Sequence, residues 1–410
     1  MRLLVTLEQF WHDVRAQKLR TTLTLLGITW GTVSVIVLLA FGVGMEKQTM
    51  KNMHGMGDGI VVMFSGSTSK PFEGFPDGRR IRFREDDVHA LRQEVSEIDE
   101  ISPEYINSET PVRRGRASTS PAITGVYPVY GDMRNVIPAQ GGRFINEPDL
   151  RLRRRVAVLG NEIKNLLFQE EEAVGQQVMV GETPFTVIGV MHEKTQNSSY
   201  HARDSDRIFI PASTHRSLFG NVYLNNIIYR PHDPLLGEAI EQQVHETLGR
   251  KHRFDPTDED AIHMWDTNEM NKFFRYFFIG FNLFMGIIGS FTLTVGGIGV
   301  ANIMYVVVRE RTREVGIKRS VGARRSDILK QFFLEAFLIV AIGALFGFLL
   351  SMGIVKGLSY LPIQEFVGVP EISRVVAVTT VSLLGLIAVL SGYFPARKAA
   401  RLDPVECLRA

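Results

Sequence analysis

The sequence predicts an α-helical membrane protein with four transmembrane helices and a large α+β extracytoplasmic domain inserted between the first and second helices. The chain has 410 residues and a mean hydropathy near zero, but its apolar residues gather in blocks towards the two ends. A helix needs roughly 20 mainly apolar residues to cross the hydrocarbon core. Four stretches meet this requirement and contain no Asp, Glu, Lys, Arg or His: 21–45, 276–308, 336–355 and 375–396. The long interval 46–275 predicts a folded domain with helical stalks.

Basic residues are concentrated on one side of the four stretches. The short connection 309–335 is dense in Arg and Lys, and basic residues also precede the first stretch and follow the fourth. Short loops rich in Lys and Arg remain in the cytoplasm. Both termini, the connection 309–335 and the tail 397–410 are therefore expected in the cytoplasm. The domain 46–275 and the short loop 356–374 are expected outside.

The segment 1–20 allows two interpretations. Leu4, Leu7, Trp11 and Val14 recur at helical intervals, which is typical of an amphipathic helix at the inner membrane surface. A simple extension of the first span, with Trp11 as an interfacial anchor, is equally open. A cleaved signal peptide is less favoured, because the apolar run of about 25 residues exceeds the usual length of about 7 to 15 and no A-x-A-like site follows it.

The inserted region should mix strands and helices around a core of its own. Its length of about 230 residues suffices for one or two domains, and the single cysteine, Cys407 in the tail, excludes a disulfide there. Short β-rich apolar runs predict strands at 60–64, 155–160, 177–180, 185–190, 208–211 and 225–229, with a hairpin loop at 181–184. Helical spacing predicts helices at 85–95, 161–168 and 234–248. The first helix should continue outward as a stalk, and 264–275 should start the helix that returns to the membrane.

Small residues recur at four-residue spacing inside the predicted spans. Such positions let two helices approach closely. The candidate helix-packing positions are Gly27, Gly31, Gly296, Gly297, Gly299, Gly343 and Gly347. The sequence leaves open whether the facing helix belongs to the same chain or to a second copy.

Several classes of function lack support in the sequence. The spans contain no charged residue or histidine, which argues against a proton-coupled carrier. No phosphate-binding loop, nucleophile elbow or H-E-x-x-H motif occurs, so no catalytic residue is assigned and the chain is not expected to be an enzyme. A formal charge of +2 gives no nucleic-acid signature. His192, His201, Asp204 and Asp206 share one polar segment, where incidental histidines are favoured over a metal site.

The connection 309–335 holds the strongest candidate site. Its first half alternates basic residues with Glu, Gly316 and Gly322 interrupt it, and a new helix should begin near Asp327, where an acid favours a helix start. To keep this connection in the cytoplasm, the basic residues alone would suffice. The embedded acids and glycines indicate a short helix that docks on a cytosolic partner. The candidate residues are Arg309, Glu310, Arg311, Thr312, Arg313, Glu314, Val315, Gly316, Ile317, Gly322 and Ala323.

These segments carry a resemblance to a known family. Residues 296–304, 309–317 and 322–336 resemble the permease signature of MacB/FtsX-type ABC transporters, and 392–405 resembles that family's closing motif. In the inserted region, 156–160, 174–175, 185–190 and 208–211 resemble the family's periplasmic core domain. The resemblance implies a four-helix permease subunit in the cytoplasmic (inner) membrane of a bacterium. It would work as a homodimer or paired with a similar chain.

The resemblance also implies partners. In this family the segment matching 309–323 contacts an ATPase, and nucleotide-driven closure is relayed to the external domain. Because this chain begins with the membrane part, we expect a separate cytosolic ATPase subunit that holds ATP and Mg, with no cofactor or metal on this chain. A second permease copy or a paralogue and membrane lipids are further expected partners, and nucleic acid is not. The sequence leaves open whether a periplasmic adaptor and an outer-membrane channel complete a tripartite efflux assembly.

The predicted function is efflux or extraction of a substrate, driven by ATP hydrolysis on the partner chain. The alternative is an FtsX-like transmembrane signalling regulator of a cell-wall hydrolase, although such regulators tend to have much shorter external regions. A membrane-anchored enzyme is a third hypothesis without a supporting motif. The sequence does not specify the transported substrate.

Overall fold

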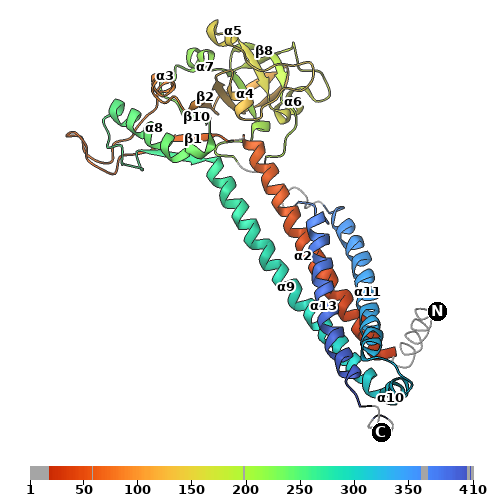
Figure 1. The fold of residues 1–410 in the computed structure, drawn as a ribbon. Coiled ribbons are helices and arrows are strands. Elements are labelled where there is room, and N and C mark those ends of the chain that lie inside the picture. Colours follow the sequence, from red (N-terminus) through yellow and green to blue (C-terminus); the bar gives the residue numbers. More distant parts are fainter. Residues whose placement is uncertain (1–17, 58, 197–198, 362–367, 404–406, 408–410) are drawn as a thin grey trace. The chain divides into compact units, whose positions relative to one another are not determined.

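The computed structural model describes residues 18–57, 59–196, 199–361, 368–403 and 407 (Figure 1). The chain divides into two compact units. The helical unit comprises Met1–Gln48 and Arg275–Ala410, and the inserted domain comprises Thr49–Phe274. The amphipathic helix expected at 1–20 lies almost wholly outside the described residues.

Four helices of the described chain are long and apolar enough to cross a membrane. They are α2 (Lys18–Met56), α9 (Thr267–Glu310), α11 (Arg325–Leu358) and α13 (Arg374–Ala400), with the short α10 (Thr312–Ser320) between α9 and α11. Large apolar side chains such as Phe284, Phe291 and Leu349 remain exposed. Exposed apolar surface on this scale suits contact with lipid tails or with another apolar helix.

The four long helices of the helical unit share a buried core. Ile28 of α2, Val300 of α9, Phe332 of α11 and Ala388 of α13 belong to one cluster of buried side chains. The segment before α13 also contacts α2, because the backbone N–H of Glu371 donates to the carbonyl of Ala40 (3.1 Å). The α2 helix therefore packs on partners from the C-terminal part of the same chain, while Leu26 and Trp30 on its other side remain exposed.

The helix that returns to the membrane begins later than expected. Residues Ile262–Asp266 form a strand, β11, in which Met264 lies opposite Met63. The helix starts at Thr267, whose hydroxyl accepts from Ile60 N (2.9 Å) and donates to Ile60 O (2.8 Å). The prediction of helix from residue 264 was wrong, because antiparallel pairing with a distant strand outweighs the local sequence preference.

A mixed sheet forms the centre of the inserted domain. Its eleven strands in the described chain run in the order β11-β1-β10-β2-β5-β9-β6-β8-β7-β3-β4. Besides β11 they are β1 (Val61–Ser65), β2 (Ile98–Asn107), β3 (Val112–Arg114), β4 (Ala117–Thr119), β5 (Ala122–Val126), β6 (Val156–Leu159), β7 (Gln177–Val180), β8 (Thr183–Val190), β9 (Arg207–Pro211) and β10 (Asn226–Pro231). The pairs β5–β9 and β6–β8 are parallel. Because β1 pairs with both β10 and β11, the two ends of the domain meet in one part of the sheet.

The expected hairpin is present with a tighter turn. In the antiparallel pair β7–β8, Val180 lies opposite Thr183. The turn therefore consists of Gly181 and Glu182 rather than all of 181–184. Gly181 has a φ of +57°, which glycine adopts without steric cost.

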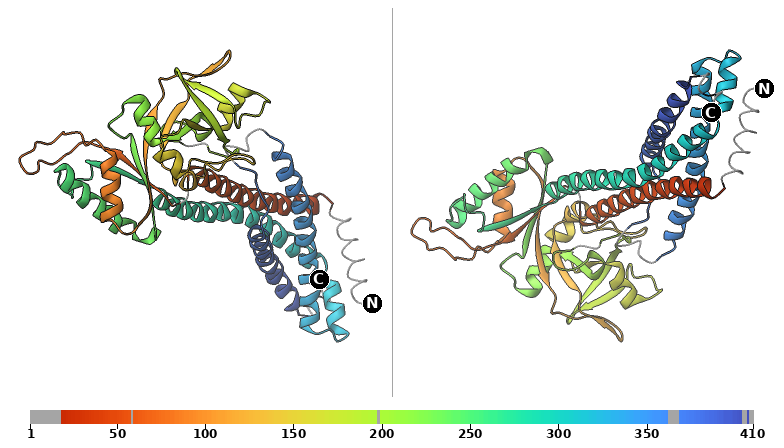
Figure 2. Two further views of the ribbon diagram at one scale, coloured as in Figure 1. Left: turned by 90° about the horizontal axis from the view of Figure 1, so that it is seen from above. Right: turned by 90° about the horizontal axis from the view of Figure 1, so that it is seen from below.

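Helices cover the sheet. The pair α3 (Glu85–Glu94) and α8 (Gly237–His252) lies side by side (Figure 2) and buries Leu91 and Val244 against β1, β2 and β10. Helix α6 (Asn161–Phe168) packs on β6 to β9. Helix α7 (Ala212–Phe219) packs on β2 and β5. Shorter turns are α4 (Tyr130–Met133), α5 (Glu147–Arg151), η1 (Asp204–Asp206) and η2 (Pro234–Leu236).

One buried histidine makes the stability of the inserted domain depend on pH. His215 of α7 is fully buried, and its ring lies 5.5 Å from the Tyr105 ring and 4.6 Å from the Phe219 ring between centroids. Burial lowers the pKa of His215 from 6.5 to about 4. Between these values the unfolded chain binds a proton that the folded domain does not. The free energy of unfolding should therefore fall by up to about 3 kcal/mol as the pH drops from 6.5 to 4.

We expect His215→Phe to reduce this acid sensitivity, because phenylalanine fills a similar site without titrating. The measurement is hydrogen exchange of α7 and β5 peptides in the full chain at pH 7 and pH 5, corrected for intrinsic exchange rates. The wild type should lose protection at pH 5, and the variant should lose less. An equal loss in both proteins would show that other groups control the effect.

Candidate functional site

The connection between α9 and α11 forms a separate short helix. Helix α10 spans most of the predicted coupling residues and ends before Gly322, whose φ is +99°. Gly316, in contrast, lies inside α10 and is buried. The expectation that Gly316 interrupts the helix was wrong, since a helix tolerates one glycine at a cost of about 1 kcal/mol. The new helix begins at Arg325, and Asp327 accepts a hydrogen bond from Arg324 N (3.1 Å) at its start.

One face of α10 is fixed to the helical unit. Val315 is buried in the same cluster as Ile328, Phe332 and Ala399. Arg319 donates from its guanidinium to the carbonyls of Ala400 (3.2 Å) and Leu402 (3.1 Å). The inward face of α10 thus contacts both α11 and the end of α13.

An ion-pair network also holds α10 in place. Arg311 contacts both Glu314 (Nε to Oε2, 3.1 Å) and Glu335 (Nη1 to Oε1, 3.1 Å). Lys318 pairs with Glu314 (2.7 Å), and Gln331 donates to Glu335 (3.2 Å). Glu335 is buried and was not singled out as a site residue. Because Glu314 makes contacts within the chain, substituting it would disturb α10 itself as well as any partner.

The opposite face of α10 is exposed. Ile317 and Val321 are 49% and 84% exposed, one helical turn apart, and Arg313 is exposed one turn earlier. Arg309 and Glu310 are exposed at the end of α9. The remaining candidates are less exposed: the Thr312 hydroxyl donates to the carbonyls of Val308 and Arg309, and Ala323 N donates to Lys318 O. An apolar pair between basic residues therefore faces outward at this end of the helical unit.

The predicted packing glycines of α2 lie against α9. A Cβ atom added to Gly27 would lie 3.4 Å from the Cα of Gly296. One added to Gly31 would lie 2.8 Å from the Cα of Leu293. The two backbones are thus nearly in contact.

The other packing glycines contact α2 and α13. A Cβ at Gly343 would meet Ile28 at 2.8 Å, and one at Gly347 would meet the Thr32 Cβ at 2.6 Å. A Cβ at Gly297 would meet Ile387 at 2.6 Å, whereas one at Gly299 would make only an ordinary 3.7 Å contact with Thr24. Within the chain, most of these glycines therefore lie at close contacts between two helices.

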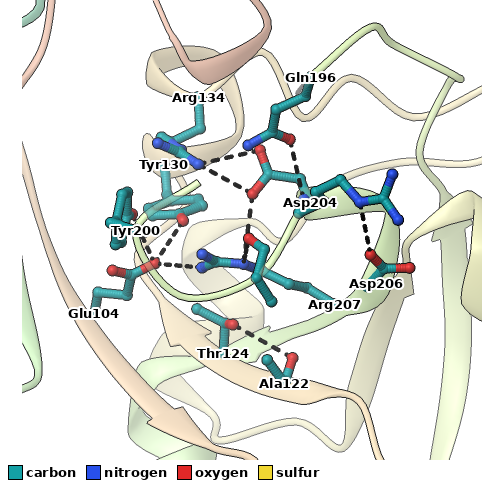
Figure 3. Close-up of polar contacts among 12 residues, drawn as sticks. Glu104, Ala122, Thr124, Tyr130, Arg134, Gln196, Tyr200, Asp204, Asp206 and Arg207 are labelled. Atoms are coloured by element: carbon teal, nitrogen blue, oxygen red, sulfur yellow. Dashed lines mark hydrogen bonds and ion pairs between the residues drawn. The ribbon is translucent and has the colours of Figure 1, made fainter. Parts of the chain in front are cut away.

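A buried ionic cluster in the inserted domain was not predicted. Asp204 of η1 pairs with Arg134 (3.1 Å), and its backbone N–H donates to Gln196 (3.0 Å) (Figure 3). Asp204 also pairs with Lys194 (2.7 Å). Burial by itself would raise the pKa of Asp204. The charges of Arg134, Lys194 and Arg207 outweigh this effect and hold the pKa at about 2. Asp204 is therefore ionised, with its charge balanced inside the protein.

The second acid of the cluster is Glu104 of β2. It pairs with Arg207 of β9 (2.7 Å) and accepts from Tyr130 (2.8 Å) and Tyr200 (3.0 Å) (Figure 3). It also accepts from Asn226 (2.7 Å). The cluster thus joins β2, β9, β10, α4 and the segment before η1. The sequence shows the charged residues of this segment but not their burial, because charged residues in a polar segment are usually solvated.

In the described part of the polar segment considered for metal binding, both aspartates pair with basic side chains. Asp204 is engaged in the cluster, and Asp206 pairs with Arg203 (3.2 Å). Within the described residues, no group of three or more His, Cys, Asp or Glu side chains is arranged to hold a metal ion.

The end of α2 contacts the same segments that the cluster holds. Asn135, just after α4, donates to the carbonyl of His54 (2.8 Å). A Cβ at Gly57 would collide with the carbonyl of Met133, and one at Gly55 with the carbonyl of Thr195. The last turn of α2 therefore packs tightly against α4 and the segment around Thr195.

Comparison with known proteins finds a matching family model for each of the two parts of the chain. Residues 21–247 match the MacB-like periplasmic core domain, and residues 275–404 match the FtsX-like permease C-terminal domain. The chain is 30% identical over 406 residues to the macrolide export ATP-binding/permease protein MacB of Bdellovibrio bacteriovorus, covering 98% of this chain and 61% of that protein. It is 34% identical over 415 residues to the pyoverdine export ATP-binding/permease protein PvdT of Pseudomonas putida, covering 99% and 60%.

The chain thus spans about three fifths of the length of these relatives. Among solved structures, the periplasmic region of MacB from Actinobacillus actinomycetemcomitans aligns with a TM-score of 0.44 and 22% identity. That alignment covers 55% of this chain and 97% of the solved one.

Proposed function

The chain belongs to the MacB/FtsX-type permease family of ABC transporters, and from this premise we propose that it is the permease subunit of an ATP-driven export machine. In this proposal a separate cytosolic ATPase subunit holds ATP and Mg. Hydrolysis there moves the helices of this chain, and the movement reaches the inserted domain, which expels or extracts a substrate. Relatives named for export of macrolides and of pyoverdine support export as the class of activity.

The observation that carries the proposal is the two-sided character of α10. Its inner face is fixed by Val315 and the Arg311–Glu335 ion pair. Its outer face presents Ile317 and Val321 to solvent. A short helix with a fixed base and an exposed apolar pair suits docking against another protein, because burying that pair gains free energy and the fixed base passes on force.

We place both termini and α10 in the cytoplasm of a bacterium and the inserted domain outside its inner membrane. The basic residues of 309–325 and 397–401 support this orientation. A second permease chain would complete the machine, and a periplasmic adaptor with an outer-membrane channel would extend it. The signalling alternative is not better supported, because the match to the FtsX-like permease domain fits both functions and the match to the MacB-like core domain over residues 21–247 favours export.

The contacts at the end of α2 support a route by which movement of the helices would reach the sheet of the inserted domain. The last turn of α2 packs on α4 and on the segment around Thr195, and the ionic cluster joins those segments to the central strands. A tilt of this turn would therefore displace the strands rather than be absorbed by a loose loop. Interlocked, close-packed segments transmit small shifts in this way.

The test of the docking surface replaces its two apolar side chains. We expect Ile317→Ser combined with Val321→Ser to reduce co-purification of the ATPase subunit about tenfold or more, because the pair would no longer bury apolar area. Both positions are exposed, so the fold should survive. The matched control is Ile317→Val with Val321→Ile, which keeps the surface apolar and should retain the ATPase. Full retention by the serine variant, with an unchanged size-exclusion profile, would refute docking at this face.

A further inference from the structure

A cavity of about 360 Å³ lies in the inserted domain beside the end of β1 and the start of β10. Leu224 and Asn226 in its wall are buried, and Phe64 is half-buried. The rest of the lining is the half-buried Ser65 and the exposed Arg80, Arg82, His201, Tyr223 and Asn225. The volume falls in the range of small-molecule sites, about 300 to 1,000 Å³.

An alternating pattern brings three arginines to one side of the segment before α3. Ile81 and Phe83 are buried in the core of the domain, whereas Arg80, Arg82 and Arg84 between and beside them are exposed. Ile81 N donates to Gly66 O (3.0 Å), and Leu224 N donates to Phe83 O (2.9 Å). The extended backbone is thus fixed on both sides of Arg82, and successive side chains alternate between core and solvent.

The side chains of these three arginines have no carboxylate partner in the part of the chain that the structure describes. Among the described residues, none forms an ion pair with Arg80, Arg82 or Arg84. The guanidinium carbons of Arg82 and Arg84 lie 5.1 and 5.3 Å from the centre of the Tyr223 ring. A hydrogen bond from Arg84 and the nearby positive charge lower the pKa of Tyr223. Positive charge is therefore concentrated at this cavity without compensation by an acid.

The two asparagines of the lining add a hydrogen-bond donor and fix the wall of the cavity. Asn225 accepts from Ile106 N (2.8 Å) through its amide oxygen, which leaves its amide nitrogen as a donor. Asn226 donates to the buried Glu104 (2.7 Å), so this wall is continuous with the ionic cluster. The lining residues contain no Asp or Glu.

We propose that this cavity binds the carboxylate or phosphate group of a small solute. Guanidinium groups bind both anions through paired N–H donors, and Phe64 and Tyr223 supply apolar walls for the rest of the molecule. The site would give the inserted domain a preference for anionic ligands. Binding does not depend on the ATPase, so it can be tested independently of the proposed export function.

The experiment uses the full chain in a nonionic detergent and follows 4-fluorobenzoate by ¹⁹F NMR line broadening. The neutral analogue 4-fluorobenzamide is the control for apolar and detergent binding. We expect Arg80→Gln combined with Arg82→Gln to weaken benzoate binding about tenfold or more, since each charged hydrogen bond contributes strongly. Arg82→Lys should bind with intermediate affinity, because it keeps the charge but loses the paired donors. Arg116→Gln, an exposed arginine near the β3–β4 turn, should bind as the wild type does.

Competition then distinguishes the two anion classes. Displacement by inorganic phosphate at lower concentration than by acetate would identify a phosphate-type site, and the reverse order a carboxylate-type site. Equal broadening of benzoate and benzamide, or unchanged benzoate binding in the double variant, would overturn the proposal. Because no variant lies in the helical unit, a negative result would leave the export function standing.

Discussion

Asp204→Asn should destabilise the inserted domain by about 3–5 kcal/mol, the usual cost of breaking a buried ion pair by removing one partner. Asparagine preserves the shape of the side chain but removes its charge. Arg134 and Lys194, both held against Asp204 by buried contacts, would then lack their counter-charge. Burial of unbalanced positive charge is the main source of the expected loss.

The measurement is hydrogen exchange of peptides from α4 and β9 in the full chain. Asp206→Asn is the matched control, because Asp206 is two residues away and pairs with Arg203 at the surface. Exposed pairs contribute at most about 1 kcal/mol, so this control should behave as the wild type does. Equal protection in Asp204→Asn and wild type would show that the cluster does not stabilise the domain.

Asp204→Asn should also separate ATPase binding from export. The substitution lies in the inserted domain, whereas the proposed docking face lies on α10 in the helical unit. We therefore expect normal co-purification of the ATPase with reduced export. Loss of both ATPase binding and export would indicate general misfolding rather than a specific loss of movement transmitted to the inserted domain.

Gly347→Leu should have the second largest effect. A Cβ at Gly347 would lie 2.6 Å from the Thr32 Cβ and 2.9 Å from the backbone oxygen of Thr29. Backbone atoms cannot avoid the clash by a change of rotamer, so α2 and α11 would have to separate. Overpacking usually costs about 1–3 kcal/mol, and a leucine at this contact should reach or exceed the upper value.

The matched control for this substitution lies on the same helix. A Cβ at Gly353 of α11 would meet nothing within 4 Å, so Gly353→Leu should be tolerated. The measurement is the yield of monodisperse protein in detergent and its midpoint of thermal unfolding. Equal midpoints for the two variants would contradict close packing of α2 on α11.

The membrane-length helices could be predicted because their signal is local. A run of about 20 apolar residues identifies a span without any knowledge of its neighbours. The same holds for the β7–β8 hairpin, whose strands are adjacent in sequence. Strand β11 could not be predicted in this way, because its pairing partner β1 lies about 200 residues earlier.

The candidate site could be predicted only in part, again because distant parts of the chain determine its structure. The position of α10 follows from its charges and glycines, but the division of its residues into an inner and an outer face depends on α11 and α13. Glu314 therefore looked like a docking residue although it pairs with Arg311 and Lys318. The ionic cluster was missed because Glu104 and Arg207 are about 100 residues apart and only the fold brings them together.

The most direct test of the account is purification of the full chain from its native membrane after chemical cross-linking, followed by mass spectrometry of the retained proteins. The account predicts an ABC ATPase subunit cross-linked to peptides of α10, together with a second permease chain. Recovery of the chain without any ATPase, from membranes in which cross-linking of other complexes succeeds, would contradict it.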